Sequence, residues 1–381
     1  MLAGTLLAIE KLLRPKASAV DPGKVRHVLV LEYLVPLGCC VHLTPFFEAL
    51  KRCRPELEIT VATRAIGSQV LRHSPRVDHL LDTPDPLTDL RGTIKSLRMR
   101  LRSLAVEPDC VLTGASDQRT RIALLGAFST PGWRGGYTVN PAVYQRPLAY
   151  DLSLSLIGNN LRLAQLLGCQ TTSIEPQVFF SHADAETART LLREVNPDAR
   201  PVLVMVTQNS GGQRTGWHTD RFARVIAHAS HTLGYEVVYV GTSADAPAIE
   251  AICRASGGVG RSLAGKTSVT QLAALLAMSD AMVTLDTGTM HVGRAAGTPM
   301  VVLGPSWQKP LEWLPLTVPS ARILRGPDRD AIPEGYQLDE ISAEAVIEAF
   351  EDIGRTYPPD EQARARRVGR SLSPVDHLPA S

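Results

Sequence analysis

Residues 282–306, MVTLDTGTMHVGRAAGTPMVVLGPS, decide the fold of this chain. An apolar run, MVTL, ends at Asp286, and a polar turn leads into a segment of small residues that a second apolar run, MVVLG, follows. This order predicts a strand, a tight turn, a helix and a second strand. Such a turn brings free backbone N–H groups and the positive end of the helix dipole to one point. The stretch therefore predicts an anion site for a phosphate-bearing ligand, although an ordinary strand–turn–helix connection fits the same pattern.

The residues before this stretch repeat the alternation of strands and helices. From about residue 181 we expect helices at 183–194, 220–233 and 246–255 and strands at 202–207 and 236–241. Ser268 and Gln271 have the spacing of a capping box at the start of a further helix. Strand, turn and helix thus alternate throughout the second half of the chain.

The first half alternates in the same way. We expect strands at 26–34, 59–63, 77–83 and 110–114 and helices at 65–73, 89–105, 122–128 and 154–168. Thr44-Pro45 predicts the N-cap and first position of a helix that ends near Pro55. Residues 131–150 are dense in Pro and Gly and predict a long functional loop. Two doubly wound parallel sheets would follow, with ligands at the carboxyl ends of their strands and a central cleft between them.

The length of 381 residues predicts two domains. We expect an amphipathic segment at 1–22, a Rossmann-like domain at 23–175, a second at 176–357, and a disordered tail at 358–381 that is rich in Pro, Ser and Arg. The N-terminal segment is expected to pack or fray, and contact with the inner membrane surface is an open alternative.

The composition excludes several classes of protein. A net charge of +2 gives no global field for nucleic acid, and aromatic residues make up only 5%. No window of the sequence has the roughly 20 apolar residues that cross a bilayer. The six cysteines show no CxxC spacing, so no zinc site is expected, and scattered thiols fit a reducing compartment. We therefore expect a cytoplasmic protein.

Three segments resemble one known family. The run from Leu263 to Ser306 resembles the C-terminal signature of glycosyltransferase family 9, the ADP-heptose:lipopolysaccharide heptosyltransferases, with its D-T-G-x-x-H segment at 286–291 and its G-P-[TS] at 304–306. The segment 216–226 is similar to the tryptophan-led helix start of that family. Residues 28–50 resemble its opening strand, "GD" loop and "TP" helix. The resemblance covers about residues 26 to 315.

The resemblance implies a GT-B fold, in which two Rossmann-like domains face a central cleft. It implies an inverting, metal-independent transfer of a heptose-type sugar from an ADP-sugar donor to an acceptor hydroxyl, without a cofactor. The donor would lie mainly against the C-terminal domain. The implied acceptor is lipopolysaccharide core or a related glycan or lipid-linked molecule.

The donor-site residues follow from the motif. Backbone N–H groups of Thr287, Gly288 and Thr289 are expected to stabilise the leaving diphosphate, while Asp286 binds donor hydroxyls. The family usually has Lys two residues before the tryptophan, where Thr215 stands here, so we expect Arg214 to neutralise the phosphates. The other donor-site candidates are Ser210, Asp245, Lys266, His291 and Ser306.

One departure from the family concerns the general base. The aspartate of the "GD" loop is the expected base, and Cys39 occupies its place. A thiol with a pKa near ~8.5 is mostly protonated at neutral pH, whereas a carboxylate is ionised. The candidate bases are Glu32, Cys39 and His42, of which we favour His42. The alternative is a non-catalytic or altered nucleotide-sugar-binding homologue, and an epimerase of the GT-B fold is a third possibility.

Overall fold

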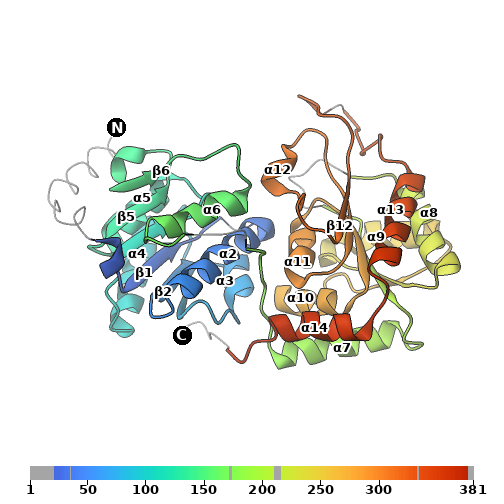
Figure 1. Cartoon of the computed structure of the whole chain (residues 1–381), viewed down its shortest axis with the longest axis horizontal. Coiled ribbons are helices and arrows are strands. Elements are labelled where there is room, and N and C mark those ends of the chain that lie inside the picture. The colour runs from blue at the N-terminus through green and yellow to red at the C-terminus, as the bar shows by residue number, and fades with distance from the viewer. Residues whose placement is uncertain (1–20, 35, 171–173, 210–215, 333, 376–381) are drawn as a thin grey trace. The chain divides into compact units, whose positions relative to one another are not determined.

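The structure is a computed structural model that describes residues 21–34, 36–170, 174–209, 216–332 and 334–375. The chain divides into two compact units (Figure 1). The N-terminal unit contains Met1–Pro176 and Pro374–Ser381, and the C-terminal unit contains Gln177–Ser373. The amphipathic segment predicted at 1–22 lies, up to residue 20, outside the described residues.

The N-terminal unit is built on six parallel strands in the order β3-β2-β1-β4-β5-β6. The strands are β1 (His27–Leu31), β2 (Glu58–Thr63), β3 (His79–Asp82), β4 (Cys110–Thr113), β5 (Trp133–Tyr137) and β6 (Arg146–Leu148). The helices are α2 (Leu37–Cys53), α3 (Ile66–Leu71), α4 (Leu90–Ser103), α5 (Thr120–Ser129) and α6 (Leu156–Gln165), with short 3-10 turns η2 (Pro22–Lys24) and η3 (Pro141–Val143).

The C-terminal unit has a second sheet of six parallel strands, in the order β12-β11-β10-β7-β8-β9. The strands are β7 (Val202–Val206), β8 (Glu236–Tyr239), β9 (Arg261–Ser262), β10 (Ala281–Leu285), β11 (Met300–Leu303) and β12 (Ala321–Leu324). The helices are α7 (His182–Val195), α8 (Thr219–Ala227), α9 (Ala246–Ala255), α10 (Val269–Met278), α11 (Gly288–Ala296), α12 (Pro310–Trp313), α13 (Ala343–Thr356) and α14 (Glu361–Ser371). A π-helical turn η4 (His228–Thr232) extends α8, and a 3-10 turn η5 (Ser243–Asp245) precedes α9.

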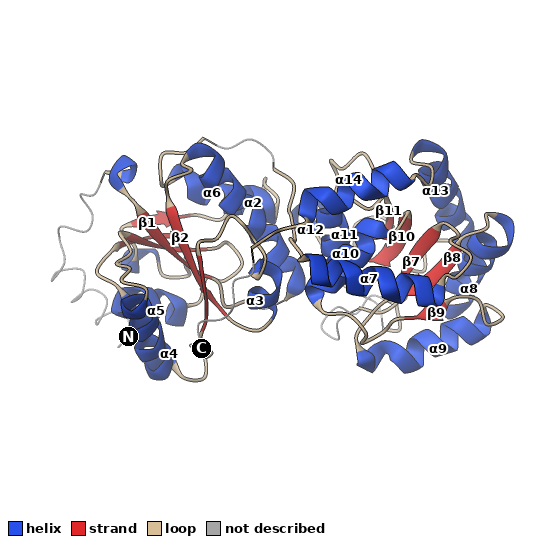
Figure 2. Cartoon of the chain, turned by 90° about the horizontal axis from the view of Figure 1, so that it is seen from below, coloured by secondary structure: helices blue, strands red, loops and turns tan. Residues whose placement is uncertain are grey.

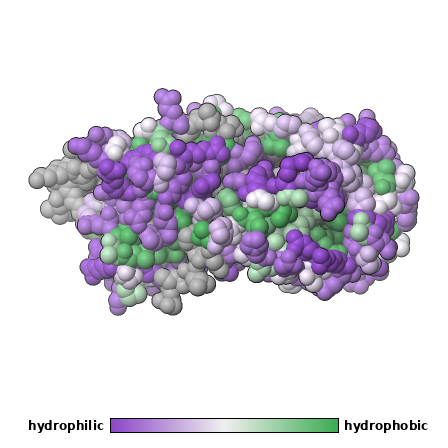
Figure 3. All heavy atoms as spheres, turned by 60° about the horizontal axis from the view of Figure 1, so that its bottom comes forward, coloured by the Kyte–Doolittle hydropathy of each residue, from purple (hydrophilic) through white to green (hydrophobic). Residues whose placement is uncertain are grey.

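Both sheets have the same doubly wound order, which confirms the predicted α/β architecture of two Rossmann-like units. In each unit helices cover the strands (Figure 2), and the strands at the switch of order, β1 and β4 or β7 and β10, have uniformly buried side chains. Hydrophilic residues cover much of the face shown in Figure 3, with smaller hydrophobic patches among them. In such sheets ligands bind at the carboxyl ends of the two strands that flank the switch.

The predicted start of the helix at Thr44-Pro45 was wrong. Helix α2 begins at Leu37, seven residues before Thr44, and continues through Pro45 to Cys53. Pro45 lacks the N–H that would bond the carbonyl of Val41, and the Thr44 hydroxyl donates to that carbonyl instead, at 2.8 Å. The Thr-Pro pair therefore lies inside the helix.

The predicted loop at 131–150 was also wrong, because it contains β5 and β6. The glycines that suggested a loop are needed by the sheet. Gly136 has a φ of +104°, and a Cβ there would lie 2.3 Å from the carbonyl oxygen of Thr113 on β4. Glycine within a strand marks such a close backbone approach.

The disordered tail predicted at 358–381 is wrong for residues 361–371, which form α14. Its arginines bond carbonyls at the ends of two other helices: Arg367 donates to Ala277 in the last turn of α10 and to Ser279 just after it, and Arg370 donates to Ala295 on α11. Arg364 pairs with Asp280, which is 3% exposed. Basic side chains commonly stabilise the carbonyl end of a helix in this way.

Cys53 and Cys169 form a disulfide between the last residue of α2 and the segment after α6. The other four cysteines are not disulfide-bonded. The sequence predicted scattered thiols only, because a pairing at this sequence separation has no local signal.

Candidate functional site

The predicted anion site lies at the carboxyl end of β10. Asp286 follows the strand directly and is 2% exposed. Neither of its carboxylate oxygens accepts a hydrogen bond from the described part of the chain. Burial raises the pKa of this carboxyl from 3.8 to about 6. A buried acceptor without a protein donor is costly to fold, and this one is positioned to accept hydrogen bonds from a ligand.

Helix α11 begins immediately after Asp286, with Thr287 as its N-cap. The Thr287 side chain does not cap the helix, and its buried hydroxyl has no partner among the described residues. The first N–H groups of a helix have no carbonyl partner within it. Thr287, Gly288 and Thr289 thus form the N-terminal end of a nine-residue helix, where the dipole favours negative charge.

His291 lies on the first turns of α11 and is buried. Its Nε2 is 3.9 Å from Oδ1 of Asp286, and its ring centroid is 6.1 Å from that of Trp313 on α12. Burial, with a smaller contribution from Arg294, lowers the pKa of His291 from 6.5 to about 3. The imidazole is therefore neutral at physiological pH and serves as a hydrogen-bonding group rather than as a cation for phosphate.

Ser306 follows β11 and is also buried. Its hydroxyl lies 3.2 Å from the hydroxyl of Tyr336, which donates to Glu340 at 2.7 Å. Arg325 donates to three carbonyl groups of this loop, those of Pro305, Ser306 and Gln308. The loop is therefore held rigidly at the carboxyl end of its strand, next to β10.

The remaining donor-site candidates lie in different surroundings. Lys266 is exposed in the turn before α10, whose predicted capping box of Ser268 and Gln271 is confirmed. Asp245 has a structural role that the sequence analysis missed, because its Oδ2 accepts from both the amide and the hydroxyl of Thr242 in another capping box. Its contact with a ribose stays a prediction. Ser210 and Arg214 lie outside the described residues.

A second group of polar residues lies at the carboxyl ends of β1 and β4 in the N-terminal unit. Glu32 is 1% exposed, and its oxygens lie 3.4 and 3.5 Å from the hydroxyl of Ser116. Asp117 accepts two hydrogen bonds from Arg119, both at 2.6 Å. Burial, and secondarily the charge of Asp117, holds the pKa of Glu32 well above its usual 4.5. A carboxyl that takes up a proton more readily than an ordinary glutamate is thus held next to a partly exposed hydroxyl.

Ser116, Asp117 and Arg119 were not among the predicted site residues. The sequence signal was present, since they follow a buried-type strand in the segment TGASDQR, but no motif marked them. Their place beside Glu32 depends on the pairing of β1 with β4, which lies far along the chain.

Cys39 and His42 lie on α2, although the expected helix start at Thr44-Pro45 would have left both residues outside a helix. Cys39 is in the first turn and 6% exposed, and His42 is in the second turn and 1% exposed. The carbonyl of His42 accepts from Asn160 on α6, whose Oδ1 accepts from the amide of Ala115. Asn160 therefore ties α2 to the segment that carries Ser116.

Two further findings bear on function. Within the ranges that the structure describes, no group of three or more His, Cys, Asp or Glu could hold a metal ion. None of the described helices is both long enough and apolar enough to cross a membrane.

The model of glycosyltransferase family 9 (heptosyltransferase) matches residues 122–333. This range covers more than half of the chain and includes β10, α11 and the loop of Ser306. A search of the curated proteins finds no match.

Solved structures of similar proteins cover nearly the whole fold. A glycosyl transferase of family 9 from Veillonella parvula is 21% identical with a TM-score of 0.74, over 86% of this chain and 97% of that chain. ADP-heptose lps heptosyltransferase II of E. coli is 21% identical with a TM-score of 0.69, over 87% of this chain and 99% of that chain. An E. coli heptosyltransferase with ADP-2-deoxy-2-fluoro heptose is 17% identical with a TM-score of 0.64, over 86% of this chain and 99% of that chain. These structures confirm the expected fold.

Proposed function

Because this chain belongs to glycosyltransferase family 9 (heptosyltransferase) and is therefore a glycosyltransferase, we propose that it transfers a heptose-type sugar from an ADP-sugar to an acceptor hydroxyl. The transfer inverts the anomeric centre and needs no metal ion. The donor binds to the C-terminal unit and the N-terminal unit activates the acceptor. Lipopolysaccharide core or a related glycan, free or lipid-linked, is the proposed acceptor, and the enzyme works in the cytoplasm.

One observation carries the proposal: Asp286, a buried carboxylate that accepts no hydrogen bond from the described residues, stands at the N-terminal end of α11. As the bond to the sugar breaks, negative charge collects on the diphosphate and positive charge on the sugar ring. The N–H groups at the start of α11 stabilise the diphosphate without rearrangement. Asp286 accepts hydrogen bonds from sugar hydroxyls, and its negative charge favours the cationic ring.

Two similar structures support the choice of donor. One E. coli heptosyltransferase was solved with ADP-2-deoxy-2-fluoro heptose, and it was also solved with ADP. That chain and this one share the fold over 86% of this chain. We therefore take ADP-heptose as the first donor to test.

Asp286→Asn tests the donor site. It keeps the size of the side chain but removes the charge and one acceptor, so we expect kcat/KM for the donor to fall by about 10²-fold or more. Affinity for ADP, measured by calorimetry, should change much less, because ADP lacks the sugar. Asp220→Asn on the exposed start of α8 is the matched control. An Asp286→Asn enzyme with the kinetics of the parent would remove this residue from the site.

For the general base, the structure favours Glu32 over the His42 that the sequence favoured. Glu32 lies at the carboxyl end of β1, and the partly exposed Ser116 hydroxyl lies within 3.5 Å of it. A carboxyl with a raised pKa accepts a proton more readily than an ordinary one, which suits a base that works near neutral pH. We propose that Glu32 takes the proton of the acceptor hydroxyl, directly or through Ser116.

The base is tested by Glu32→Gln, which should lower kcat by about 10²–10⁴-fold while leaving the affinity for ADP unchanged. His42→Gln and Cys39→Ser are compared in the same assay, and whichever variant alone loses turnover identifies the base. The non-catalytic alternative predicts a different pattern. In that case ADP binds to the parent chain, but neither transfer nor donor hydrolysis occurs with any acceptor.

A further inference from the structure

Helix α4 of the N-terminal unit carries an unusual distribution of charge. Its 14 residues include five cations and no acid. Thr93, Leu97 and Leu101 are buried, and the two leucines belong to a core cluster under the helix. The outward side chains of Arg91, Lys95, Arg98 and Arg102 are exposed. We call these four residues, with Met99, the basic face of α4.

The spacing of these cations is unfavourable for the helix itself. Neighbours on the face are three or four residues apart, where like charges repel and destabilise a helix. None of the four forms an ion pair with a residue in the described part of the chain, in contrast to Arg64, Arg76 and Arg119 of the same unit, which all pair with carboxylates. The fold thus gains nothing in ion pairing from this concentration of positive charge.

An apolar side chain stands among the cations. Met99 is 61% exposed, the highest value among the large hydrophobic residues of the described helices. Long basic side chains around an exposed apolar one are typical of a helix that lies on a membrane surface. A face that met only water would have no use for the methionine.

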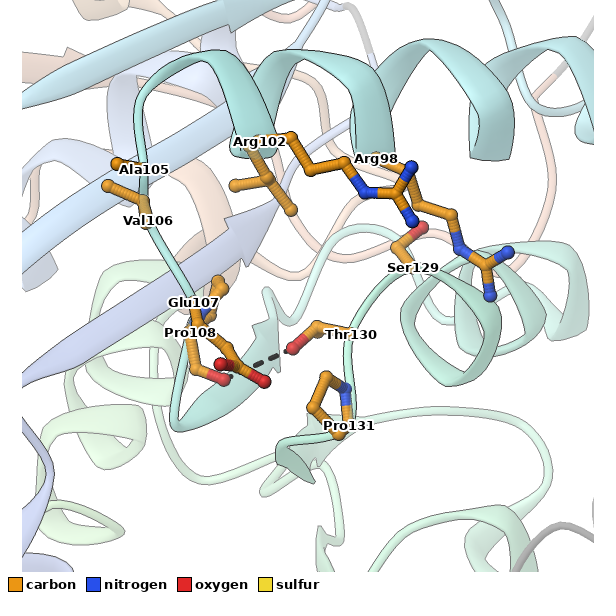
Figure 4. Close-up of a pocket in the computed structure, with 10 residues that line it drawn as sticks. Arg98, Arg102, Ala105, Val106, Glu107, Pro108, Ser129, Thr130 and Pro131 are labelled. Atoms are coloured by element: carbon orange, nitrogen blue, oxygen red, sulfur yellow. Dashed lines mark hydrogen bonds between the residues drawn. The ribbon is translucent and has the colours of Figure 1, made fainter.

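The C-terminal half of the basic face borders a hollow of about 620 Å³ between the ends of α4 and α5. Figure 4 shows the side chains of Arg98 and Arg102 extending from α4 along the side where Ser129 lies. Ser129 is 8% exposed, and its hydroxyl has no partner among the described residues. Among the described residues that line the hollow, Glu107 is the one acid. The two guanidinium groups are donors that suit the phosphate of a lipid headgroup.

From these observations we propose that the basic face of α4 docks the enzyme onto an anionic phospholipid surface. Cations near such a surface each strengthen binding, and the hollow admits a headgroup phosphate. The proposal goes beyond the transferase activity, since it concerns where the enzyme works and not which bond it forms. It accounts for positive charge that neither the core nor the ion pairs of the unit use.

Nucleic acid is the other polyanion that a basic helix can meet, and the structure disfavours it. The basic face contains no aromatic side chain on which bases could stack. The net charge of the whole chain is only +2, so no wider field extends the face. An exposed methionine gains little from a sugar–phosphate backbone but is buried among lipid chains.

Sedimentation of the full chain with vesicles tests the proposal. Vesicles of phosphatidylcholine with about a third phosphatidylglycerol should bind the protein, and pure phosphatidylcholine should not. Added salt should release it, since salt screens exposed charges. The triple variant K95E/R98E/R102E should bind at least about 100-fold more weakly, because the loss of each cation near the surface costs about fivefold and the new carboxylates are repelled.

The matched control is K24E/R193E/R261E, which makes the same change in net charge at three exposed residues outside α4. It should bind nearly as the parent does. The glutamine variant K95Q/R98Q/R102Q, checked for folding by circular dichroism, separates loss of charge from repulsion and should still bind at least tenfold more weakly. Equal binding of parent and α4 variants would overturn the proposal. The proposal would also be overturned if the control variant lost as much vesicle binding as the α4 variants, if the parent bound neutral vesicles, or if nucleic acid displaced the protein from anionic vesicles in competition.

Discussion

At the scale of single residues, the burial of Asp286 shows that the proposed donor site costs stability. Its carboxyl is buried, no described group donates to it, and its pKa is raised from 3.8 to about 6. The folded state therefore holds the proton more tightly than the unfolded state does. Above pH 6 the folded protein must keep a buried charge, and the free energy of unfolding is lower there by about 3 kcal/mol than it is below pH 4.

Asp286→Asn should consequently stabilise the protein while it impairs donor use. Because the variant has no charge to bury, its free energy of unfolding at pH 8 should exceed that of the parent by up to about 3 kcal/mol. The gain should shrink as the pH falls through 6 and disappear below about pH 3, where the parent carboxyl is protonated in both states. Denaturant unfolding across this pH range measures the effect, and comparison with the parent cancels the opposite pH dependence of His291, whose pKa is lowered to about 3. A gain independent of pH would contradict the assigned cause.

Asp286 was predictable from the sequence, whereas Glu32 and its neighbours were predictable only in part. The motif 286–291 lies within one strand–turn–helix connection, so local spacing reveals it. Glu32 and Ser116 lie 84 residues apart and meet because β1 pairs with β4. A single sequence offers no local signal for such a contact.

At the scale of secondary-structure elements, α2 shows how a short motif can mislead. Thr-Pro usually begins a helix, but here the Thr44 hydroxyl bonds the carbonyl that Pro45 leaves without a donor. The same Thr-Pro pair is thus compatible with the start of a helix and with the interior of one. The apolar side chains that follow Pro36 decide between them, because a helix that starts at Leu37 buries them.

A double-mutant cycle tests this account of α2. Thr44→Val removes the donor to the buried carbonyl of Val41 and should lower the free energy of unfolding by about 1–3 kcal/mol. In the Pro45→Ala background the backbone N–H at residue 45 can supply that bond, so the same change at Thr44 should cost well under 1 kcal/mol. Urea unfolding of the four proteins gives the coupling energy. Additive effects would show that the hydroxyl does not compensate for the proline.

The other misassigned elements failed for related reasons. Strand β5 has the sequence WRGGY, in which glycine signals a turn when the sequence is read locally but serves the close approach of β4 in the sheet. Helix α14 is rich in arginine, which suggests a solvated tail. Its arginines, however, bond to helix ends and to Asp280, groups that are brought to it only by the tertiary fold. In both cases the contacts made in the tertiary structure outweighed the local conformational preference of the residues.

At the scale of the whole molecule, the repeated architecture follows from the sequence, because each unit has its own buried apolar strands separated by helix signals. The disulfide between Cys53 and Cys169 does not follow from it. This bond lies within the N-terminal unit and joins residues 116 positions apart. It fastens the end of α2 to the end of α6, the two helices that Asn160 also connects.

Closing a loop of this length restricts the unfolded chain and should stabilise the N-terminal unit by about 4–5 kcal/mol. Cys169→Ser, or reduction, should therefore lower the stability of the N-terminal unit alone and shift only its unfolding transition. Cys253→Ser in the C-terminal unit should leave the unfolding transitions of both units unchanged. Alkylation in denaturant should label four thiols without reductant and six with it. Because a reducing cytoplasm disfavours disulfides, trapping the thiols in intact cells also tests the proposed compartment. Six labelled thiols in the purified, unreduced protein would contradict the pairing, and the stability of the N-terminal unit would then rest on its core alone.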